Sequence, residues 1–528
     1  MSINKVNITI DGTAHTVDSK KMLIEITDEL GIYIPRFCYH EKLSIAGNCR
    51  MCLVEMEKSP KPIASCAMPA AEGMKIFTNT ENVKNARKGV MEFLLINHPL
   101  DCPICDQGGE CDLQDQALHY GFDKSRYQEN KRAVKNKYMG PLVSTIMTRC
   151  IHCTRCVRFS TEVAGVDDLG LLGRGENAEI TTYLEKTIKS ELSGNVIDLC
   201  PVGALTSKPY AFKARPWELH KTESIDVFDA MGSSIRIDTL GKKTLRVLPR
   251  LNEEINEEWI SDKSRFAIDG LSNQRIDVPY VKEKEKLVSS SWDYVLKKII
   301  NEINQRGKEN TLSLSGKFTD LETIFSAKNF LKSLGSNFYE CRYDNVQFIE
   351  NKRASYIFNS TIQEIDNAEA ILLIGTNPRW EASVLNSRIR KAYLKNNTEI
   401  YSFGNVGDLT YDYIVLDNST KIIKDIIENN HEISKKIINS KKPSIIIGQS
   451  ILKMKSGIYI FEELKKYLTI NNKINDEWNS LNVLSNNAAT VGSYDLDILS
   501  SKNGNNNTLE KIKKNEFDVI FLFGQENL

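Results

Sequence analysis

The 528-residue sequence contains no apolar run near the length of about 18 residues that is needed to cross a bilayer. Its first residues lack the basic segment and apolar stretch of an export signal. A net charge is also missing, because 69 basic side chains balance 69 acidic ones, and no basic block of the kind that binds phosphate backbones occurs. These absences predict a soluble protein that stays where it is made, has no nucleic-acid partner and reaches a membrane only through partner proteins.

Motifs of independent catalysis are missing too. The sequence has no nucleophile paired with a base, no Walker loop and no Gly-x-Gly-x-x-Gly motif after a predicted strand. The run from Gly170 to Gly175 is superficially similar to a phosphate loop, but it has no strand-turn-helix context. We therefore expect no independent active site in this chain.

Cysteine, in contrast, is concentrated, since eleven of the twelve cysteines lie between Cys38 and Cys200. Where thiols stay reduced, closely spaced cysteines indicate metal ligands and not a disulfide framework. With one histidine they form three sets of four donors, which matches three iron–sulfur clusters. The sets are Cys38-x10-Cys49-x2-Cys52-x13-Cys66, His98-x3-Cys102-x2-Cys105-x5-Cys111, and Cys150-x2-Cys153-x2-Cys156 with Cys200. His40 and His152 are surplus to this count, so we expect neither to bind metal.

The first set follows a predicted hairpin with an Asp11-Gly12 turn and a short predicted helix from Met22 to Leu30. A small sheet, one helix and a cysteine-bearing loop are typical of plant-type ferredoxins, although the first spacing here is ten residues instead of four. This pattern predicts a 2Fe-2S cluster. A structural zinc site is the alternative, and the absence of paired zinc-ribbon spacings speaks against it.

The second set has only three cysteines, whereas a 4Fe-4S cluster takes four ligands. A predicted helix from Glu81 to Asn97 ends just before His98. A histidine at a helix end is more often a cap or a surface residue, but the missing ligand favours His98 as the fourth donor. Beyond this set, the polar and charged stretch from Leu113 to about Tyr138 predicts a surface connection with solvated charges.

The third set uses the cysteine triplet with which bacterial ferredoxins hold three corners of a 4Fe-4S cluster. Cys200, followed by Pro201, fits the distant fourth ligand. Arg149, Arg155 and Arg158 flank the triplet. They are either surface charges or a source of positive potential beside an anionic cluster, and the sequence leaves both interpretations open.

Together the three sets resemble those of the large iron–sulfur subunit, the G-type or 75 kDa-like one, in the peripheral arm of proton-pumping NADH:quinone oxidoreductase (respiratory complex I). The resemblance covers nearly the whole chain, and the His98-to-Cys111 motif is highly specific. It implies one 2Fe-2S cluster and two 4Fe-4S clusters. The implied ligands are Cys38, Cys49, Cys52 and Cys66 for the 2Fe-2S cluster, His98, Cys102, Cys105 and Cys111 for the first 4Fe-4S cluster, and Cys150, Cys153, Cys156 and Cys200 for the second.

The resemblance also implies a function, namely relay of electrons from the NADH- and FMN-binding subunit towards quinone in the respiratory chain. The expected partners are other peripheral-arm subunits, including that flavin subunit and the iron–sulfur subunits nearer quinone. The expected location is peripheral, on the cytoplasmic side of the bacterial inner membrane or on the matrix side of the mitochondrial one.

From Trp217 onward the chain resembles the family's large domain, which is similar to molybdopterin oxidoreductases. Apolar runs ending in glycine recur at residues 370–375, 445–448 and 519–524, as expected of buried parallel strands. Some bacterial members bind a further 4Fe-4S cluster at the start of this domain, but residues 217–226 contain no cysteine, so we expect that cluster to be missing. At Cys341 a buried thiol is commoner than a molybdenum ligand, and no molybdenum is expected.

The expected fold class is therefore α+β ferredoxin-like N-terminal modules followed by an α/β molybdopterin-oxidoreductase-like domain. The expected domains are a plant-type 2Fe-2S ferredoxin-like domain (1–78), a His/Cys 4Fe-4S binding segment (79–139), a 4Fe-4S ferredoxin-like domain (140–216) and the α/β domain without metal (217–528). The resemblance implies further α/β units, whereas Leu528 follows a predicted core strand closely, so we expect the last domain to be truncated or unusually short.

Two other functions stay open at this point. An NAD-linked formate dehydrogenase or a hydrogenase can share the same front end, although a hydrogenase needs more cysteines after Cys200 and a formate dehydrogenase needs a pterin-metal site. A non-catalytic scaffold with structural zinc is a rival of a different class. Iron and sulfide would support electron transfer, whereas zinc would refute it.

Overall fold

The computed structural model describes residues 5–342, 346–349, 352–499 and 508–524. The chain divides into two compact units, the first made of Met1–Lys221 and Asp238–Arg246 and the second of Thr222–Ile237 and Val247–Leu528. Leu528, on which the expectation of a short last domain rests, lies outside the described residues. Within these ranges, none of the helices combines the length and the hydropathy that a membrane span requires.

The first unit begins with the predicted hairpin and helix. Strands β1 (Lys5–Ile10) and β2 (Thr13–Asp18) pair antiparallel, and Asp11 and Gly12 both have positive φ, as a tight two-residue turn requires. Helix α1 (Leu23–Glu29) follows and β3 (Leu53–Met56), β4 (Ile63–Ala64) and β5 (Lys75–Phe77) complete a sheet of order β2-β1-β5-β3-β4. Apolar side chains of β1 and α1 share one core with Cys52 and Cys66.

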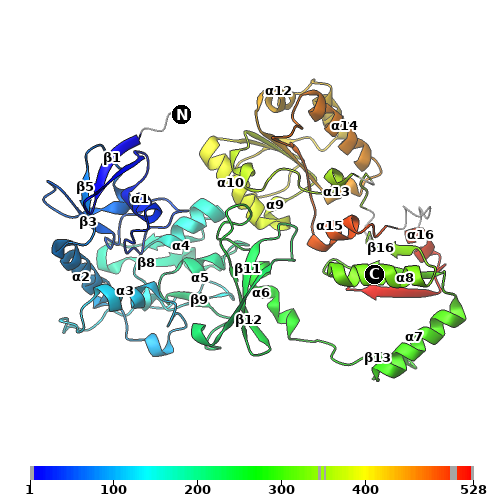
Figure 1. Ribbon diagram of the computed structural model, residues 1–528, viewed down its shortest axis with the longest axis horizontal. Helices are drawn as coiled ribbons and strands as arrows, with labels where there is room; N and C mark the ends of the chain where they lie inside the picture. Colours follow the sequence, from blue (N-terminus) through cyan, green and yellow to red (C-terminus); the bar gives the residue numbers. More distant parts are fainter. Residues whose placement is uncertain (1–4, 343–345, 350–351, 500–507, 525–528) are drawn as a thin grey trace. The chain divides into compact units, whose positions relative to one another are not determined.

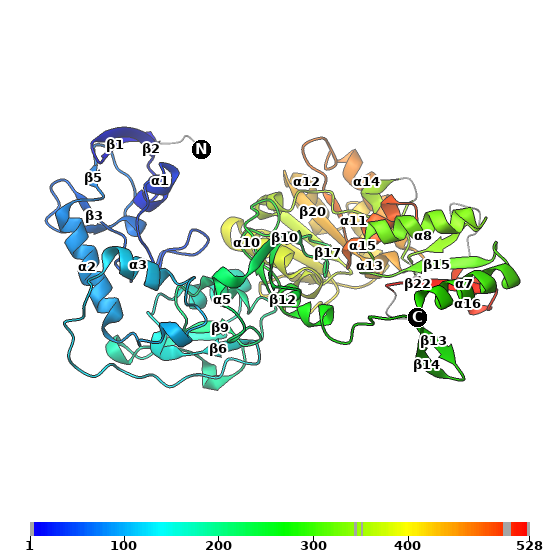
Figure 2. The ribbon, with the colours of Figure 1, turned by 60° about the horizontal axis from the view of Figure 1, so that its bottom comes forward.

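Helix α2 (Glu81–Ile96) matches its prediction, and its first turn is capped by the Thr80 hydroxyl, which accepts a hydrogen bond from the Val83 N–H (3.2 Å). Helix α3 (Asp112–Tyr120) lies beside it (Figure 2). The expectation of a mere surface connection after Leu113 is therefore wrong for this stretch. Its polar residues obscured a buried side formed by Leu113 and by Gln116, whose amide donates to the Arg36 carbonyl (2.9 Å).

Short elements surround the third cysteine set. They are β6 (Val143–Thr145), α4 (Arg155–Arg158), β7 (Leu169–Leu172), β8 (Glu179–Thr182), α5 (Asn195–Leu199) and β9 (Leu205–Ser207). Strand β6 precedes Cys150, β9 follows Cys200, and the two strands pair antiparallel. This pairing brings the distant Cys200 back to the triplet.

Strands β10 (His220–Ile225), β11 (Ser234–Leu240) and β12 (Lys243–Pro249) come next, and the boundary between the units falls among them. In the second unit, α6 (Asp262–Phe266) and a hairpin of β13 (Tyr280–Glu283) and β14 (Lys286–Ser289) lead into the α/β part.

A parallel sheet of order β19-β18-β17-β20-β21 forms the centre of the second unit. Its strands are β17 (Ala370–Ile374), β18 (Glu399–Phe403), β19 (Ile414–Leu416), β20 (Pro443–Gly448) and β21 (Leu481–Leu484). Helices α9 (Pro378–Glu381) and α10 (Ser383–Asn396) lie on one side of the strands, and α12 (Glu432–Asn439) and α14 (Gly457–Ile470) on the other (Figure 1). Helices α11 (Thr420–Ile427) and α13 (Gln449–Leu452) contribute side chains to the same hydrophobic core as the sheet.

A smaller parallel sheet has the order β16-β15-β22, with β15 at Thr311–Ser315, β16 at Phe338–Glu340 and β22 at Val519–Phe523. The accompanying helices are α7 (Trp292–Arg306), α8 (Leu321–Ser333), α15 (Ala488–Asp495) and α16 (Thr508–Lys513). The predicted strands at 370–375 and 445–448 are buried and parallel, as expected. The third, β22, is parallel but not buried, since Ile520 and Leu522 are 43% and 44% exposed.

Two carboxylates are buried near the start of the second unit. Asp226 accepts hydrogen bonds from the Ser264 hydroxyl (2.7 Å) and the Phe228 N–H (3.2 Å), and Asp229 accepts one from the Met231 N–H (2.9 Å). Burial, with the nearby Asp226 charge, raises the pKa of Asp229 from its ordinary 3.8 to about 6. Between these pH values the folded state binds a proton that the unfolded chain has released, so stability falls as the pH rises through this window.

Replacing Asp229 by Asn should remove this pH dependence. Above pH 6 the unmutated protein carries a buried charge, so Asp229→Asn should raise the unfolding free energy of the second unit at pH 8 by up to about 3 kcal/mol. At pH 5 the gain should shrink, because Asp229 is then mostly protonated. Urea unfolding followed by the fluorescence of the buried Trp259 measures the difference. A gain of equal size at both pH values would contradict this account.

Candidate metal centres

The first set brings its four sulfurs together in the ferredoxin-like part of the first unit. The Cys49 and Cys66 thiols donate hydrogen bonds to Cys38, and the Cys66 thiol also interacts with Cys52. These bonds lower the pKa of the Cys38 thiol to about 2 and raise the pKa values of Cys49 and Cys66, which are also raised by burial. Backbone N–H groups of Asn48 and Cys49 point at the Cys38 sulfur, as the loop around a cluster requires.

The second set lies after helix α2, where the chain turns at Asn97. Cys105 and Cys111 are buried, Cys102 is exposed, and the Cys105 N–H donates to the Cys102 carbonyl (3.3 Å). Within the described residues, the buried Nδ1 of His98 has no hydrogen-bond partner. Burial, with the charges of Arg149 and Lys131, lowers the pKa of His98 to about 4, so its ring is neutral, which is the form that binds metal.

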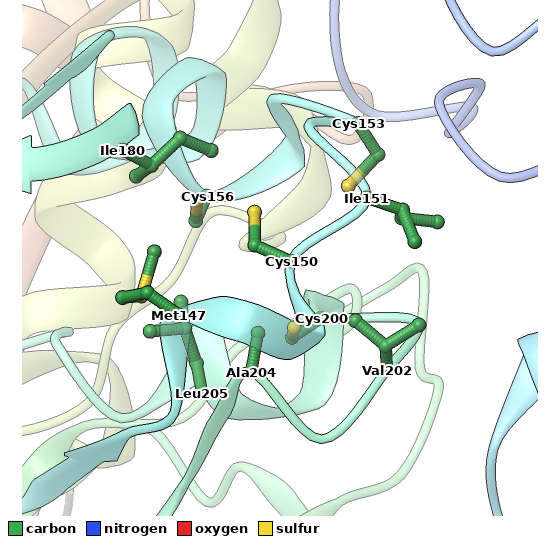
Figure 3. Close-up of a pocket in the computed structure, with 10 residues that line it drawn as sticks. All are labelled: Met147, Cys150, Ile151, Cys153, Cys156, Ile180, Cys200, Val202, Ala204 and Leu205. Carbon is green, nitrogen blue, oxygen red and sulfur yellow. The ribbon is translucent and has the colours of Figure 1, made fainter. Parts of the chain in front are cut away.

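The third set lines one cavity (Figure 3). Cys150, Cys153, Cys156 and Cys200 share it with six apolar residues, which are Met147, Ile151, Ile180, Val202, Ala204 and Leu205. Burial raises the pKa of Cys150 to about 12, that of Cys153 and Cys200 to about 11, and that of Cys156 as well. Uncharged thiols in an apolar cavity fit a bound cation, which deprotonates the thiols that coordinate it.

Backbone groups in the third set are also directed at sulfur. The His152 N–H donates to the Cys150 sulfur (3.4 Å), and N–H groups of Val202, Ala204 and Leu205 interact with Cys200. His152 and Thr154 have positive φ, an uncommon conformation for such residues, and this bends the chain between the cysteines. In the described part of the chain, no three His, Cys, Asp or Glu side chains form a group that could hold a single metal ion. The fit to a cluster therefore rests on the shared cavity and N–H groups in the third set. In the first set it rests on the interactions among the cysteines and on N–H groups.

The second and third sets also meet at a glycine that the sequence did not single out. A Cβ added at Gly203 would overlap the Cys105 sulfur and would lie 3.2 Å from Cβ of Gln107. The Cys111 sulfur lies 3.7 Å from the Pro201 carbonyl oxygen. The segment that follows Cys200 therefore packs directly against the second set. A glycine shortly after a Cys-Pro pair was the available signal, but its contact partner was not evident from the sequence.

The remaining candidates have protein partners. His152 Nε2 lies 2.9 Å from the Ala178 carbonyl oxygen, and His40 Nδ1 accepts from the Lys42 N–H (3.3 Å). The Cys341 thiol is buried and donates to the Ile498 carbonyl (3.4 Å).

Family comparisons cover most of the chain. The matching descriptions are a 2Fe-2S iron–sulfur cluster binding domain (4–81), an NADH-ubiquinone oxidoreductase-G iron–sulfur binding region (87–126), the ferredoxin-like domain of NADH-quinone oxidoreductase subunit 3 (140–206), an NADH-ubiquinone oxidoreductase NDSU1/NuoG-like 4Fe-4S domain (219–269) and molybdopterin oxidoreductase (275–528). Residues 219–269 contain no cysteine. The expected fold class is confirmed, since domains of the iron–sulfur binding, ferredoxin-like kind precede a molybdopterin-oxidoreductase-like domain.

Curated relatives are similar over almost the whole chain. The NADH-ubiquinone oxidoreductase 75 kDa subunit of Reclinomonas americana is 50% identical, over 98% of this chain and 76% of the relative. The G subunit of the NADH-quinone oxidoreductase of Rickettsia bellii is 48% identical, over 99% and 76%. The mitochondrial NADH dehydrogenase [ubiquinone] iron-sulfur protein 1 of Solanum tuberosum is 50% identical, over 94% and 67%. The chain belongs to the family of the G, or 75 kDa, subunit of NADH-quinone oxidoreductase.

Among solved structures, a chain of an NAD+-reducing [NiFe]-hydrogenase is similar at 27% identity with a TM-score of 0.37, over 40% of this chain and 90% of that chain.

Proposed function

We propose that this chain relays electrons in NADH:quinone oxidoreductase through one 2Fe-2S and two 4Fe-4S clusters, from the NADH- and FMN-binding subunit towards quinone. The 2Fe-2S cluster is assigned to Cys38, Cys49, Cys52 and Cys66, the first 4Fe-4S cluster to His98, Cys102, Cys105 and Cys111, and the second to Cys150, Cys153, Cys156 and Cys200. The observation that carries the proposal is the cavity lined by the four thiols of the third set.

A bound cluster supplies one-electron redox chemistry without breaking a covalent bond of the protein. The residues of this chain supply ligands, N–H groups directed at sulfur and an apolar environment, and these set both the stability and the potential of such a centre. Contacts between the sets support relay within this chain. Asn48, next to Cys49, donates to the His152 carbonyl in the third set (3.1 Å), and Gly203, close to Cys200, packs on the second set.

Partner subunits are the other components of the NADH-quinone oxidoreductase. We assign the flavin subunit and the iron–sulfur subunits nearer quinone as direct partners of this chain. We place the chain at the cytoplasmic face of a bacterial inner membrane or at the matrix face of a mitochondrial one. The loop of the second set supports docking, since Leu100 and Ile104 beside Cys102 are 89% and 62% exposed. We assign no metal to the α/β domain, whose one cysteine donates to a carbonyl in a buried core.

Metal analysis and low-temperature EPR of the dithionite-reduced protein test the assignment. We expect about ten iron atoms and as many inorganic sulfides per chain, with signals of one two-iron and two four-iron centres. Zinc in a colourless protein would refute electron transfer. Molybdenum or tungsten would favour the formate dehydrogenase alternative.

Replacing His98 by Cys should lower the midpoint potential of the first four-iron centre. A thiolate in place of a neutral imidazole makes the cluster more negative and disfavours reduction, by on the order of 100 mV as judged from other His-ligated clusters. Redox-poised EPR measures the shift, and the other two centres serve as internal references. An unchanged spectrum and potential would remove His98 from the ligand set.

A further inference from the structure

Arg149, directly before Cys150, reaches the second ligand set. Its guanidinium donates to Asp101, the neighbour of Cys102, with Nε and Nη2 each 2.9 Å from Oδ2, and its Nη1 lies 3.4 Å from the Gly203 carbonyl oxygen. The Arg149 side chain is only 3% exposed. The positive charge of Arg149 also lowers the pKa of His98. A single buried cation therefore contacts both the segment before Cys102 and the segment after Cys200.

Arg158, two residues after the last cysteine of the triplet, reaches the loop of the first ligand set in the same way. Its guanidinium donates to the carbonyl groups of Cys38 and Ser44 in the first set and to that of Cys153 in the third (3.2 Å). Its Nε also donates to the Thr154 hydroxyl (3.3 Å). The Arg158 guanidinium thus connects the backbone at Cys38, a ligand of the first set, to the backbone at Cys153, a ligand of the third set.

The third arginine, Arg155, contacts neighbours of ligands in both other sets. It donates to the Tyr39 carbonyl (2.8 Å), and its Nη1 lies 3.8 Å from a carboxylate oxygen of Asp112. Burying a guanidinium is costly unless its donors are satisfied. Arg149 satisfies its donors on the Asp101 carboxylate and the Gly203 carbonyl. The half-buried Arg158 satisfies its donors on backbone carbonyls and on the Thr154 hydroxyl. The interpretation as surface charges is therefore wrong for Arg149 and Arg155, which are buried, whereas Arg158 is half-buried.

We propose that Arg149 and Arg158 are positioning residues of the relay, each fastening the third ligand set to one neighbouring set and placing a positive charge between two adjacent clusters. This inference rests on the proposed function. Iron–sulfur clusters with thiolate ligands are anionic, and their potentials depend on net charge and on hydrogen bonding nearby. A fixed positive charge between two such centres favours the reduced form of both.

The test is a redox titration, followed by EPR, of the full chain carrying its iron and sulfide. Arg149→Gln should lower the midpoint potentials of both four-iron centres and leave the two-iron centre unchanged. Arg158→Gln should lower those of the two-iron centre and the second four-iron centre and leave the first unchanged. At an effective dielectric constant of about 20, losing one nearby charge should change the reduced-to-oxidised ratio of each affected centre by about tenfold at a fixed potential.

Matched variants separate charge from structure. Arg149→Lys and Arg158→Lys keep the charge but not the planar fork, so they should restore the potentials while changing the EPR line shapes of the same centres. Arg126→Gln removes an exposed arginine paired with Glu92 and should change no potential. The two four-iron signals are told apart by the one that responds to His98→Cys.

The inference is overturned if the Gln variants keep all three potentials, if every centre shifts alike, or if the Lys variants lower the potentials as far as the Gln variants do. If a Gln variant holds too little cluster to titrate, the Lys variant decides, since an unchanged potential supports a charge role and a lowered one excludes it. Failure of the proposed function is a different result, because the unmutated protein would then hold no iron–sulfur signals at all.

Discussion

Removing iron from the holoprotein should open the first unit and leave the second folded. In the first unit the cysteines belong to the core, where Cys52 and Cys66 pack with Ile8 and Ile24 of the ferredoxin-like part. Residues 38–52 and 97–101, which carry or flank ligands, contain neither helix nor strand in this structure. Ligand binding to metal contributes directly to folding in such domains, so the loops lose their main source of order when iron is removed.

Limited proteolysis after chelation under reducing conditions measures this effect. We expect cleavage at residues 97–111 and 150–156 to become about tenfold faster or more, since such cleavage follows the population of opened chain. The second unit is the internal control, because the core around β17 and β20 contains no proposed ligand. Equal protection of the iron-free and iron-loaded first units would show that the clusters do not support its fold.

Local sequence signals correctly predicted those helices and turns whose formation depends on neighbouring residues in the sequence. The Asp11-Gly12 turn fixes the first hairpin, and the apolar spacing after Thr80 fixes α2 to within a residue of its observed end. The grouping of the twelve candidate ligands came from spacing alone, and the assignment of each set to a cluster stays a prediction. The spacing shows how many donors lie close together in the sequence. This is enough to identify the triplet as a ligand set, but it does not predict which residues surround the triplet in the fold.

Contacts between distant segments could not be predicted in this way. Strands β6 and β9 bring Cys200 close to Cys150 because they pair with each other. Both strands are short, and the sequence of neither one predicts this pairing. Helix α3 was missed because its apolar positions are few and its burial depends on α2 and on the Arg36 carbonyl. The flanking arginines were correctly left open, since only their partners across the fold distinguish a buried connector from a surface charge.

Replacing Gly203 by Ala should remove the first four-iron centre. The added Cβ would overlap the Cys105 sulfur and press on Gln107 Cβ at 3.2 Å, and Arg149 Cδ lies 3.6 Å away. The backbone at Gly203 does not lie in the left-handed region, so space and not conformation requires glycine here. A sulfur atom that is bound to iron cannot move aside in the way that the end of a flexible side chain can. Either Cys105 must leave its position as a ligand or the segment after Cys200 must move. The iron content should fall by about four atoms per chain, and one four-iron EPR signal should be lost.

Gly89→Ala is the matched control for this loss. Gly89 lies in the same unit, inside α2, and a Cβ added there meets no atom within 4 Å. Alanine in a helix interior is more stable than glycine by roughly 0.5–1 kcal/mol, so this variant should keep all its iron and unfold at a slightly higher temperature. If Gly203→Ala retained the iron content and spectrum of the unmutated protein, the segment after Cys200 would not be packed against a ligand of the first four-iron centre, and the assignment of Cys105 would lose its structural support.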